Sequence, residues 1–169
     1  MRSGRPHTWN IAESFSGDAW TGIVDLTSKD RLQLPTSVRR RLTWLAAGED
    51  QQVLAEIQEE AVELQPWREA GAELVARLEE IAQSLSAERR QDLVIATMDR
   101  YSRLSVGADG RLVLPAHLAH HLAVGATEVV RIVVRCNRLW LWSEASWRRE
   151  RQSRNTDLDA LLQRPQSDP

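Results

Sequence analysis

An internal repeat constrains the fold of this chain more than any other feature. The segment around residues 25–42 recurs without a gap when Arg31 is set on Arg111, a shift of 80 positions (111 − 31). The matched pairs are Leu32 with Leu112, Leu34 with Leu114, Pro35 with Pro115, Val38 with Leu118, and Leu42 with Leu122. With 169 residues, each half is too small to bury a sizeable core by itself. The repeat therefore predicts two copies of one unit that share a core.

The match continues past these segments at a shift of 77. It pairs Gly48 with Gly125, Val53 with Val130, Ile57 with Val134, Val62 with Leu139, and Leu64 with Leu141. Alternating and β-branched residues separated by turn residues are typical of strands joined in hairpins. Each unit is predicted to be strand, turn, strand, short helix, strand, turn, strand. Pro35 ends the second strand, and we expect Thr36 and Ser37 to cap the helix that follows.

Helices are predicted between and after the two units. An apolar stripe at helical spacing, formed by Leu74, Leu78, Ile81 and Leu85, predicts an amphipathic helix over 68–85 that packs on the body. We expect a shorter helix after Ser86. Near the end of the chain, Ser143 is placed to cap another helix, with Trp142 and Trp147 as a hydrophobic staple. Beyond Arg154 we expect fraying, with a weak docking patch at Leu158, Leu161 and Leu162.

Charge is unevenly distributed along the chain. The net charge is −2 and the isoelectric point is about 6.1, and these values alone argue against binding to nucleic acid. Residues 29–41, however, carry five basic residues and one acid, and residues 131–154 carry seven arginines and two acids. Residues 49–92 hold twelve acids and four arginines. This asymmetry predicts a basic surface opposed by an acidic connector.

Several functional classes are disfavoured by composition. No apolar run approaches the roughly 18 residues expected of a membrane span. No apolar run follows the charges of residues 1–7, so we expect no secretory signal. Cys136 stands alone, which excludes an intrachain disulfide. A cytoplasmic protein fits these observations best.

Candidate catalytic and metal-binding residues are sparse. His117 and His121 have the i, i+4 spacing of a metal-binding pair, but no Cys or carboxylate lies nearby in sequence, which favours an exposed helical face over a zinc site. No paired carboxylates, triad or phosphate-binding glycine loop stands out. We therefore expect no enzymatic activity, no metal and no other cofactor, and no small-molecule substrate is evident.

The two turn segments resemble the MraZ family, which belongs to the AbrB/SpoVT swapped-hairpin superfamily. The resemblance covers about residues 15–150. Three segments carry it: Ser28-Lys-Asp-Arg-Leu-Gln-Leu-Pro35, Gly107-Ala-Asp-Gly-Arg-Leu-Val-Leu-Pro115, and Asn137-Arg-Leu-Trp-Leu-Trp142 through Trp147. It implies an α+β, β-rich fold, in which a tandem swapped-hairpin β-barrel with a pseudo-twofold repeat carries a linking helical hairpin and a C-terminal helix.

The resemblance also implies boundaries for each part of the chain. They are a mobile N-terminal arm (1–14), a first SpoVT-AbrB-like repeat (15–67), a helical connector (68–99), a second repeat with the start of the C-terminal helix (100–148), and the helix end and tail (149–169).

As a function, the resemblance implies a transcriptional regulator of division and cell-wall genes. Such a protein assembles as a homo-oligomeric ring at the nucleoid and presents its turn loops to double-stranded promoter DNA. An arginine just past a hairpin tip can contact phosphate or a guanine edge, which makes Arg31 and Arg111 the candidates for base readout. Lys29, Arg39 and Arg40 are the candidates for phosphate contacts.

Two other functions remain open on sequence grounds. The first is a structural or protein-interaction module that keeps the barrel and the oligomer but no longer reads DNA. Asp30 favours it, because a carboxylate in the first turn repels phosphate. The second is an antitoxin of the AbrB type, for which residues 155–169 offer little surface to bind a toxin.

Overall fold

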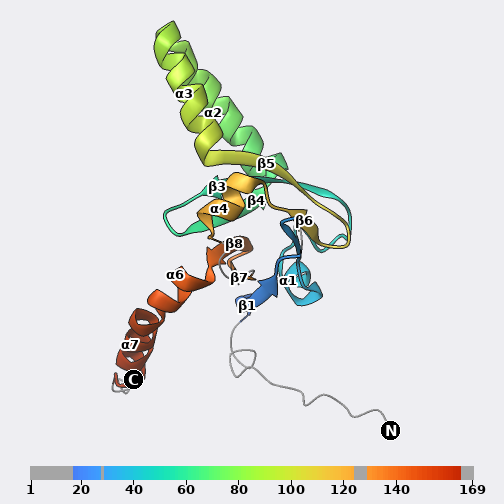
Figure 1. Cartoon of the computed structure of the whole chain (residues 1–169), viewed down its shortest axis with the longest axis vertical. Helices are drawn as coiled ribbons and strands as arrows, with labels where there is room; N and C mark the ends of the chain where they lie inside the picture. Colours follow the sequence, from blue (N-terminus) through green and yellow to red (C-terminus); the bar gives the residue numbers. More distant parts are fainter. Residues whose placement is uncertain (1–16, 28, 124–128, 165–169) are drawn as a thin grey trace, which may run out of the picture.

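The computed structural model describes residues 17–27, 29–123 and 129–164 (Figure 1). The expected N-terminal arm and the match of Gly48 to Gly125 lie outside these residues. The first unit consists of β1 (Trp20–Asp25), β2 (Arg31–Gln33), α1 (Thr36–Arg41), β3 (Gln51–Ile57) and β4 (Ala61–Pro66). The second consists of β5 (Tyr101–Val106), β6 (Arg111–Val113), α4 (Ala116–His121), β7 (Val129–Arg135) and β8 (Arg138–Ser143). The predicted order of elements is therefore confirmed in both units.

The eight strands form one antiparallel sheet in the order β1-β7-β8-β4-β3-β5-β6-β2. A bridge between Thr27 and Arg31 brings the two ends of this order together, so the sheet is a nearly closed barrel. The units interlock, because β1 of the first pairs with β7 of the second, and β5 of the second pairs with β3 of the first. Neither unit completes the sheet without the other, which confirms the expected β-rich, swapped-hairpin barrel.

The register of the sheet defines a pseudo-twofold axis. On the β2–β6 ladder, Leu32 lies opposite Leu112, and these residues occupy the same position in the two units. On the β4–β8 ladder, Glu63 lies opposite Trp140, which is 77 positions further on (140 − 63). A residue that pairs with its own counterpart marks the axis. The axis therefore crosses the barrel at these two pairs.

The core of the barrel is built from the repeated apolar positions. The matched leucines of both units are almost completely buried, with exposed fractions of 1% or less. They are Leu32, Leu34, Leu42, Leu112, Leu114 and Leu122. Val38 in α1 and Leu118 in α4 join them with no exposed surface. Burying such side chains contributes about 1.5–3 kcal/mol each, so the repeated positions are the ones that hold the two units together.

The connector between the units is a pair of helices that project away from the barrel (Figure 1). It consists of a short π-helix, η2 (Trp67–Gly71), then α2 (Ala72–Gln83) and α3 (Ala87–Arg100). Neither α2 nor α3 has a buried residue, so the expected packing of the apolar stripe on the body was wrong. Because η2 continues directly into α2, the first helical segment covers 67–83, and α3 is the shorter of the two, as expected.

The helices after the barrel extend the repeat further than the sequence comparison did. Strand β8 runs into α6 (Glu144–Arg149) and α7 (Arg151–Leu162), just as β4 runs into η2 and α2. At the same shift of 77, Glu73 matches Glu150 and Arg77 matches Arg154. The expected fraying beyond Arg154 was wrong, because α7 continues to Leu162. Among the described residues, no helix has the length and apolar character needed to cross a membrane.

The ends of the helices follow the predictions in part. Ser143 accepts a hydrogen bond from the Ser146 N–H, and the rings of Trp142 and Trp147 meet edge to face at 5.6 Å, which confirms the cap and the staple. The expected caps of α1 were wrong. Pro35 occupies the N-cap position and no side chain caps the helix, because Thr36 and Ser37 already lie within its first turn.

Candidate nucleic-acid interface

The two turns that carry the family motifs lie at opposite ends of the antiparallel β2–β6 ribbon, each next to the end of the other unit's strand. The N–H of Leu34 donates to the carbonyl of Gly110 at 2.9 Å, and the N–H of Leu114 donates to the carbonyl of Asp30 at 2.9 Å. These bonds are related by the pseudo-twofold axis. Each turn is therefore held by the end of the other unit's strand, and the ribbon links the two turns.

The outer face of the β2–β6 ribbon is polar and basic. Leu32 and Leu112 point into the core, while their neighbours on each strand are exposed. Arg31 lies opposite Val113, and Gln33 lies opposite Arg111. Because side chains on one face of an antiparallel ladder stand together, both arginines lie on the outer face, diagonally across the axis. The structure thus brings together the two residues predicted for base readout.

Three of the predicted cations are exposed and have no carboxylate partner within the described parts of the chain. They are Lys29, Arg31 and Arg40. Lys29 and Asp30 both adopt positive φ angles, 80° and 55°, which turn the backbone tightly between β1 and β2. The ammonium and guanidinium groups of this set are available to an external anion.

Arg39 is placed differently from the other cations. Its guanidinium donates to the Ala108 carbonyl at 3.1 Å and to the Thr36 hydroxyl at 3.2 Å, so it links α1 to the turn of the second unit. Its Nε is buried and has no hydrogen-bond partner among the described residues. Arg39 therefore positions the second turn through its own side chain.

Acidic and amide groups also hold the second turn. Asp109 accepts a hydrogen bond from the Arg111 N–H at 3.1 Å and forms an ion pair with the Arg111 guanidinium at 3.2 Å. Asp50 accepts a hydrogen bond from the Ala108 N–H at 2.7 Å. The Gln33 amide donates to the Asp109 carbonyl. Sequence reasoning missed Gln33 and Asp50, because neither residue type recurs at the matching position of the repeat, where Val113 and Thr127 stand.

The histidines of α4 do not assemble a metal centre with other ligands. The His117 Nε2 lies 2.9 Å from the Ser102 hydroxyl oxygen, within hydrogen-bond distance. The His121 Nε2 is buried without a hydrogen-bond partner. Within the described ranges, no group of three or more His, Cys, Asp or Glu residues is arranged to hold a metal ion.

Comparison with known proteins supports the same family. No protein-family model matches the chain. The chain is 29% identical over 138 residues to the transcriptional regulator MraZ of Escherichia coli O127:H6 (strain E2348/69 / EPEC). The alignment covers 82% of this chain and 85% of that protein. Together with the repeated unit and the interlocked barrel, this similarity supports assignment of the chain to the MraZ family of transcriptional regulators.

Proposed function

We propose that this protein is a sequence-specific regulator that reads double-stranded promoter DNA through the β2–β6 ribbon and its two turns. The observation that carries the proposal is the pairing of the ribbon. It sets Arg31 and Arg111 on one exposed face, related by the pseudo-twofold axis. B-DNA is itself pseudo-symmetric, and its major groove admits a two-stranded β-ribbon.

The charged groups have distinct roles in this proposal. Arg31 and Arg111 reach base edges, where a bidentate contact to guanine discriminates by about 1–3 kcal/mol. Lys29 and Arg40 contact phosphates on either side, which positions the protein without specifying sequence. Arg39 contributes by holding the second turn against α1. The repeats at 15–67 and 100–148 thus each supply one reading turn.

Oligomerisation strengthens binding in this proposal. One ribbon makes few phosphate contacts and binds weakly. The projecting helices expose a run of large apolar side chains, Val75, Ile81, Val94, Ile95 and Met98, which offers a surface for association of subunits. A homo-oligomeric ring presents several ribbons to repeated half-sites and increases avidity without any additional interaction per subunit.

The biological setting of the proposal comes from the family resemblance. The target is the promoter of a division and cell-wall gene cluster, and the protein acts there as a repressor. It works in the cytoplasm at the nucleoid, as a binding protein without catalysis or a cofactor.

Fluorescence anisotropy on promoter DNA tests this proposal. The measurement compares DNA from the gene's own upstream region with a random duplex across a salt series. In the double variant Arg31→Ala with Arg111→Ala, we expect preference for the upstream duplex to disappear. The slope of log K against log salt should change little, because the proposal assigns the phosphate contacts to Lys29 and Arg40. The control is Arg68→Ala with Arg77→Ala, which removes the same charge from exposed positions of the connector.

The control should bind like the wild type. Equal and weak binding to both duplexes, unchanged by Arg31→Ala with Arg111→Ala, would reject DNA readout and leave the interaction module as the better description.

A further inference from the structure

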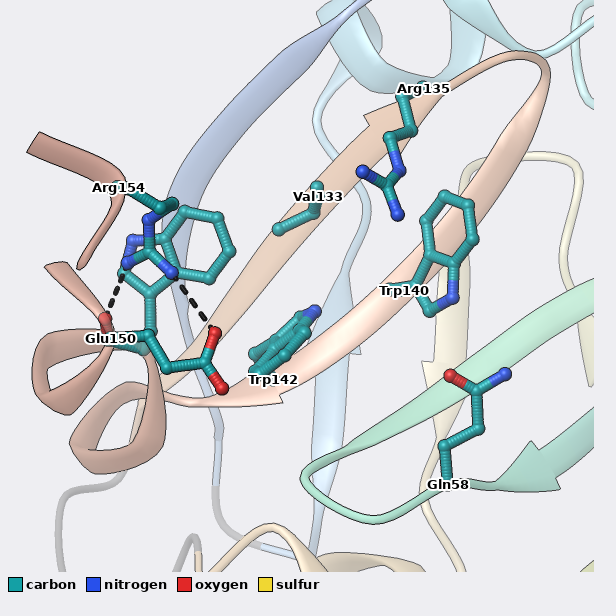
Figure 2. Close-up of a pocket in the computed structure, with 8 residues that line it drawn as sticks. Gln58, Val133, Arg135, Trp140, Trp142, Glu150 and Arg154 are labelled. Atoms are coloured by element: carbon teal, nitrogen blue, oxygen red, sulfur yellow. Dashed lines mark hydrogen bonds and ion pairs between the residues drawn. The ribbon is translucent and has the colours of Figure 1, made fainter. Parts of the chain in front are cut away.

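A second candidate site lies on the far side of the barrel from the ribbon. A cavity of about 330 Å³ lies between the outer face of β7 and β8 and the helices α6 and α7 (Figure 2). Three indoles dominate its wall, those of Trp140, Trp142 and Trp147. The pseudo-twofold axis crosses the barrel at two opposite walls. One crossing lies at the β2–β6 ribbon, and the other lies at Trp140, next to this cavity. A ligand here would not compete with DNA for space.

Hydrogen-bond donors around the indoles are available to a ligand. The Arg135 guanidinium lies 5.1 Å from the ring centre of Trp140, and Figure 2 shows it beside that indole. Within the described parts of the chain, Arg135 has no carboxylate partner, and no group accepts a hydrogen bond from the indole N–H of the three tryptophans. Arg154, by contrast, is engaged, because it stacks on Trp147 at 3.7 Å and pairs with Glu150 at 3.3 Å.

The first unit shows what the fold itself requires at this place. Its equivalent cavity lies against η2 and α2 and is lined at the corresponding positions by Glu56, Gln65 and Ala70, where the second unit has Val133, Trp142 and Trp147. Here the Arg100 guanidinium pairs with Glu56 at 2.6 Å, so the charge of Glu56 is already paired by a residue of the protein.

The two units differ at two further positions that matter for the second cavity. Gln58, which itself lines the second cavity, is the counterpart of Arg135, and Glu63 is the counterpart of Trp140, each 77 positions apart. The barrel thus forms in the first unit without the three indoles and without a cation at the position of Arg135. The aromatic and cationic character of the second cavity is an addition to the fold.

We propose that this cavity binds a small planar aromatic anion, such as an aromatic carboxylate. The ring stacks on the indoles, which offer flat apolar faces, and the carboxylate accepts charge-assisted hydrogen bonds from Arg135. The volume lies within the range of small-molecule sites, at the lower end of about 300–1,000 Å³. The proposal does not depend on DNA binding.

Isothermal titration calorimetry with three probes tests the ligand class. The probes are 1-naphthoate, the neutral 1-naphthamide of the same shape, and cyclohexanecarboxylate, which has the charge without the planar ring. We expect 1-naphthoate to bind at least about tenfold more tightly than either of the others, a difference that corresponds to 1.4 kcal/mol. Tryptophan fluorescence should be quenched by 1-naphthoate over the same concentration range.

Two variants locate the site. Arg135→Gln installs the residue that the first unit holds at the equivalent position, and it should abolish the preference for 1-naphthoate over 1-naphthamide. Trp140→Leu keeps an apolar side chain on β8 and should weaken all aromatic binding about tenfold. The control is Arg103→Gln, because Arg103 stacks on Trp67 at 4.4 Å outside this cavity, and this variant should bind like the wild type.

Thermal unfolding checks that each variant is folded before titration. Absence of 1-naphthoate binding to the folded wild-type protein at millimolar concentration would overturn the proposal. Equal affinity for the carboxylate and the amide would overturn it too, as would binding that is unaffected by Arg135→Gln.

Discussion

The side chain of Arg39 lies so close to Gly110, in the turn of the other unit, that a Cβ atom there would come within 2.7 Å of Arg39 Cδ. Gly110 also adopts a φ of 86°, which side chains disfavour. The matching residue of the first turn is Asp30, and the counterpart of Arg39 is Ala119, whose methyl group is far shorter. One turn needs glycine and the other tolerates aspartate because different residues face them.

Replacing Gly110 by alanine should therefore destabilise the protein in two ways. The left-handed backbone costs about 1–2 kcal/mol for a residue with a Cβ atom, and Arg39 must also move away from the turn. Urea unfolding measures the sum. Gly48→Ala is the matched control, because Gly48 has a φ of 68° but nothing within 4 Å of the added Cβ. We expect Gly110→Ala to lower the free energy of unfolding by at least about 1 kcal/mol more than Gly48→Ala does. Equal decreases in the two variants would show that Arg39 does not restrict position 110.

Arg39 and Arg40 are adjacent in α1 but should behave differently when changed to alanine. Arg39→Ala removes the bond to the Ala108 carbonyl and should increase amide hydrogen exchange at residues 107–110. Arg40 is exposed and contacts no described carboxylate, so Arg40→Ala should leave exchange in the turn unchanged. On DNA, Arg40→Ala should reduce the salt slope, by about 0.9 if this side chain neutralises one phosphate. If amide hydrogen exchange at residues 107–110 is unaltered in Arg39→Ala, Arg39 does not position the second turn.

The aspartates of the two turns should weaken DNA binding. Asp109 pairs with the Arg111 guanidinium, and Asp30 adds a negative charge to the first turn. Asn keeps the acceptor for the Arg111 N–H and tolerates positive φ, so Asp30→Asn with Asp109→Asn changes charge with little change in backbone preference. We expect tighter binding to both specific and random duplexes at low salt, with the difference shrinking at high salt. Anisotropy that shows no gain at low salt would contradict this electrostatic account.

The barrel could be predicted because its signals are local and occur twice. Apolar residues such as Leu34 and Leu114 repeat with the strand and helix periods, and each copy supports the reading of the other. The interlocking of the two units came from the family resemblance, and the partner of β1 is given by the structure alone, because periodicity within one strand does not identify its partner.

Long-range relationships between side chains could not be predicted in the same way. The stripe of Leu74, Leu78 and Ile81 indicates a helix but not what covers it, and in this structure the helices project from the barrel. From the sequence, Arg39 is an exposed cation on a basic helix. In the structure its guanidinium donates to the carbonyl of Ala108, a turn residue 69 positions away. The match of Glu73 with Glu150 was present in the sequence but was hidden by otherwise dissimilar helices.

A buried ion pair fastens α6 to the barrel and makes stability depend on pH. The Arg131 guanidinium on β7 donates two hydrogen bonds to the Glu144 carboxylate, each at 2.9 Å, and the two side chains are 12% and 4% exposed. Hydrogen bonding from Arg131, and then from Arg148, lowers the pKa of Glu144 below its usual value of 4.5. Because the folded pKa is the lower one, this contribution is fully present above about pH 4.5 and is lost as the pH falls through the folded value.

Removing Arg131 should therefore be costly at neutral pH. Arg131→Ala leaves the Glu144 carboxylate buried with only Arg148 beside it, and we expect a loss of about 3 kcal/mol in urea unfolding. Arg148→Ala is the matched control, because it contacts the same carboxylate from a side chain that is 67% exposed and should cost less than about 1 kcal/mol. Below pH 4 the difference in free energy of unfolding between wild type and Arg131→Ala should narrow, because Glu144 takes up a proton. A gap that stays constant from pH 7 to pH 3 would show that packing of Arg131, rather than its charge, holds α6 in place.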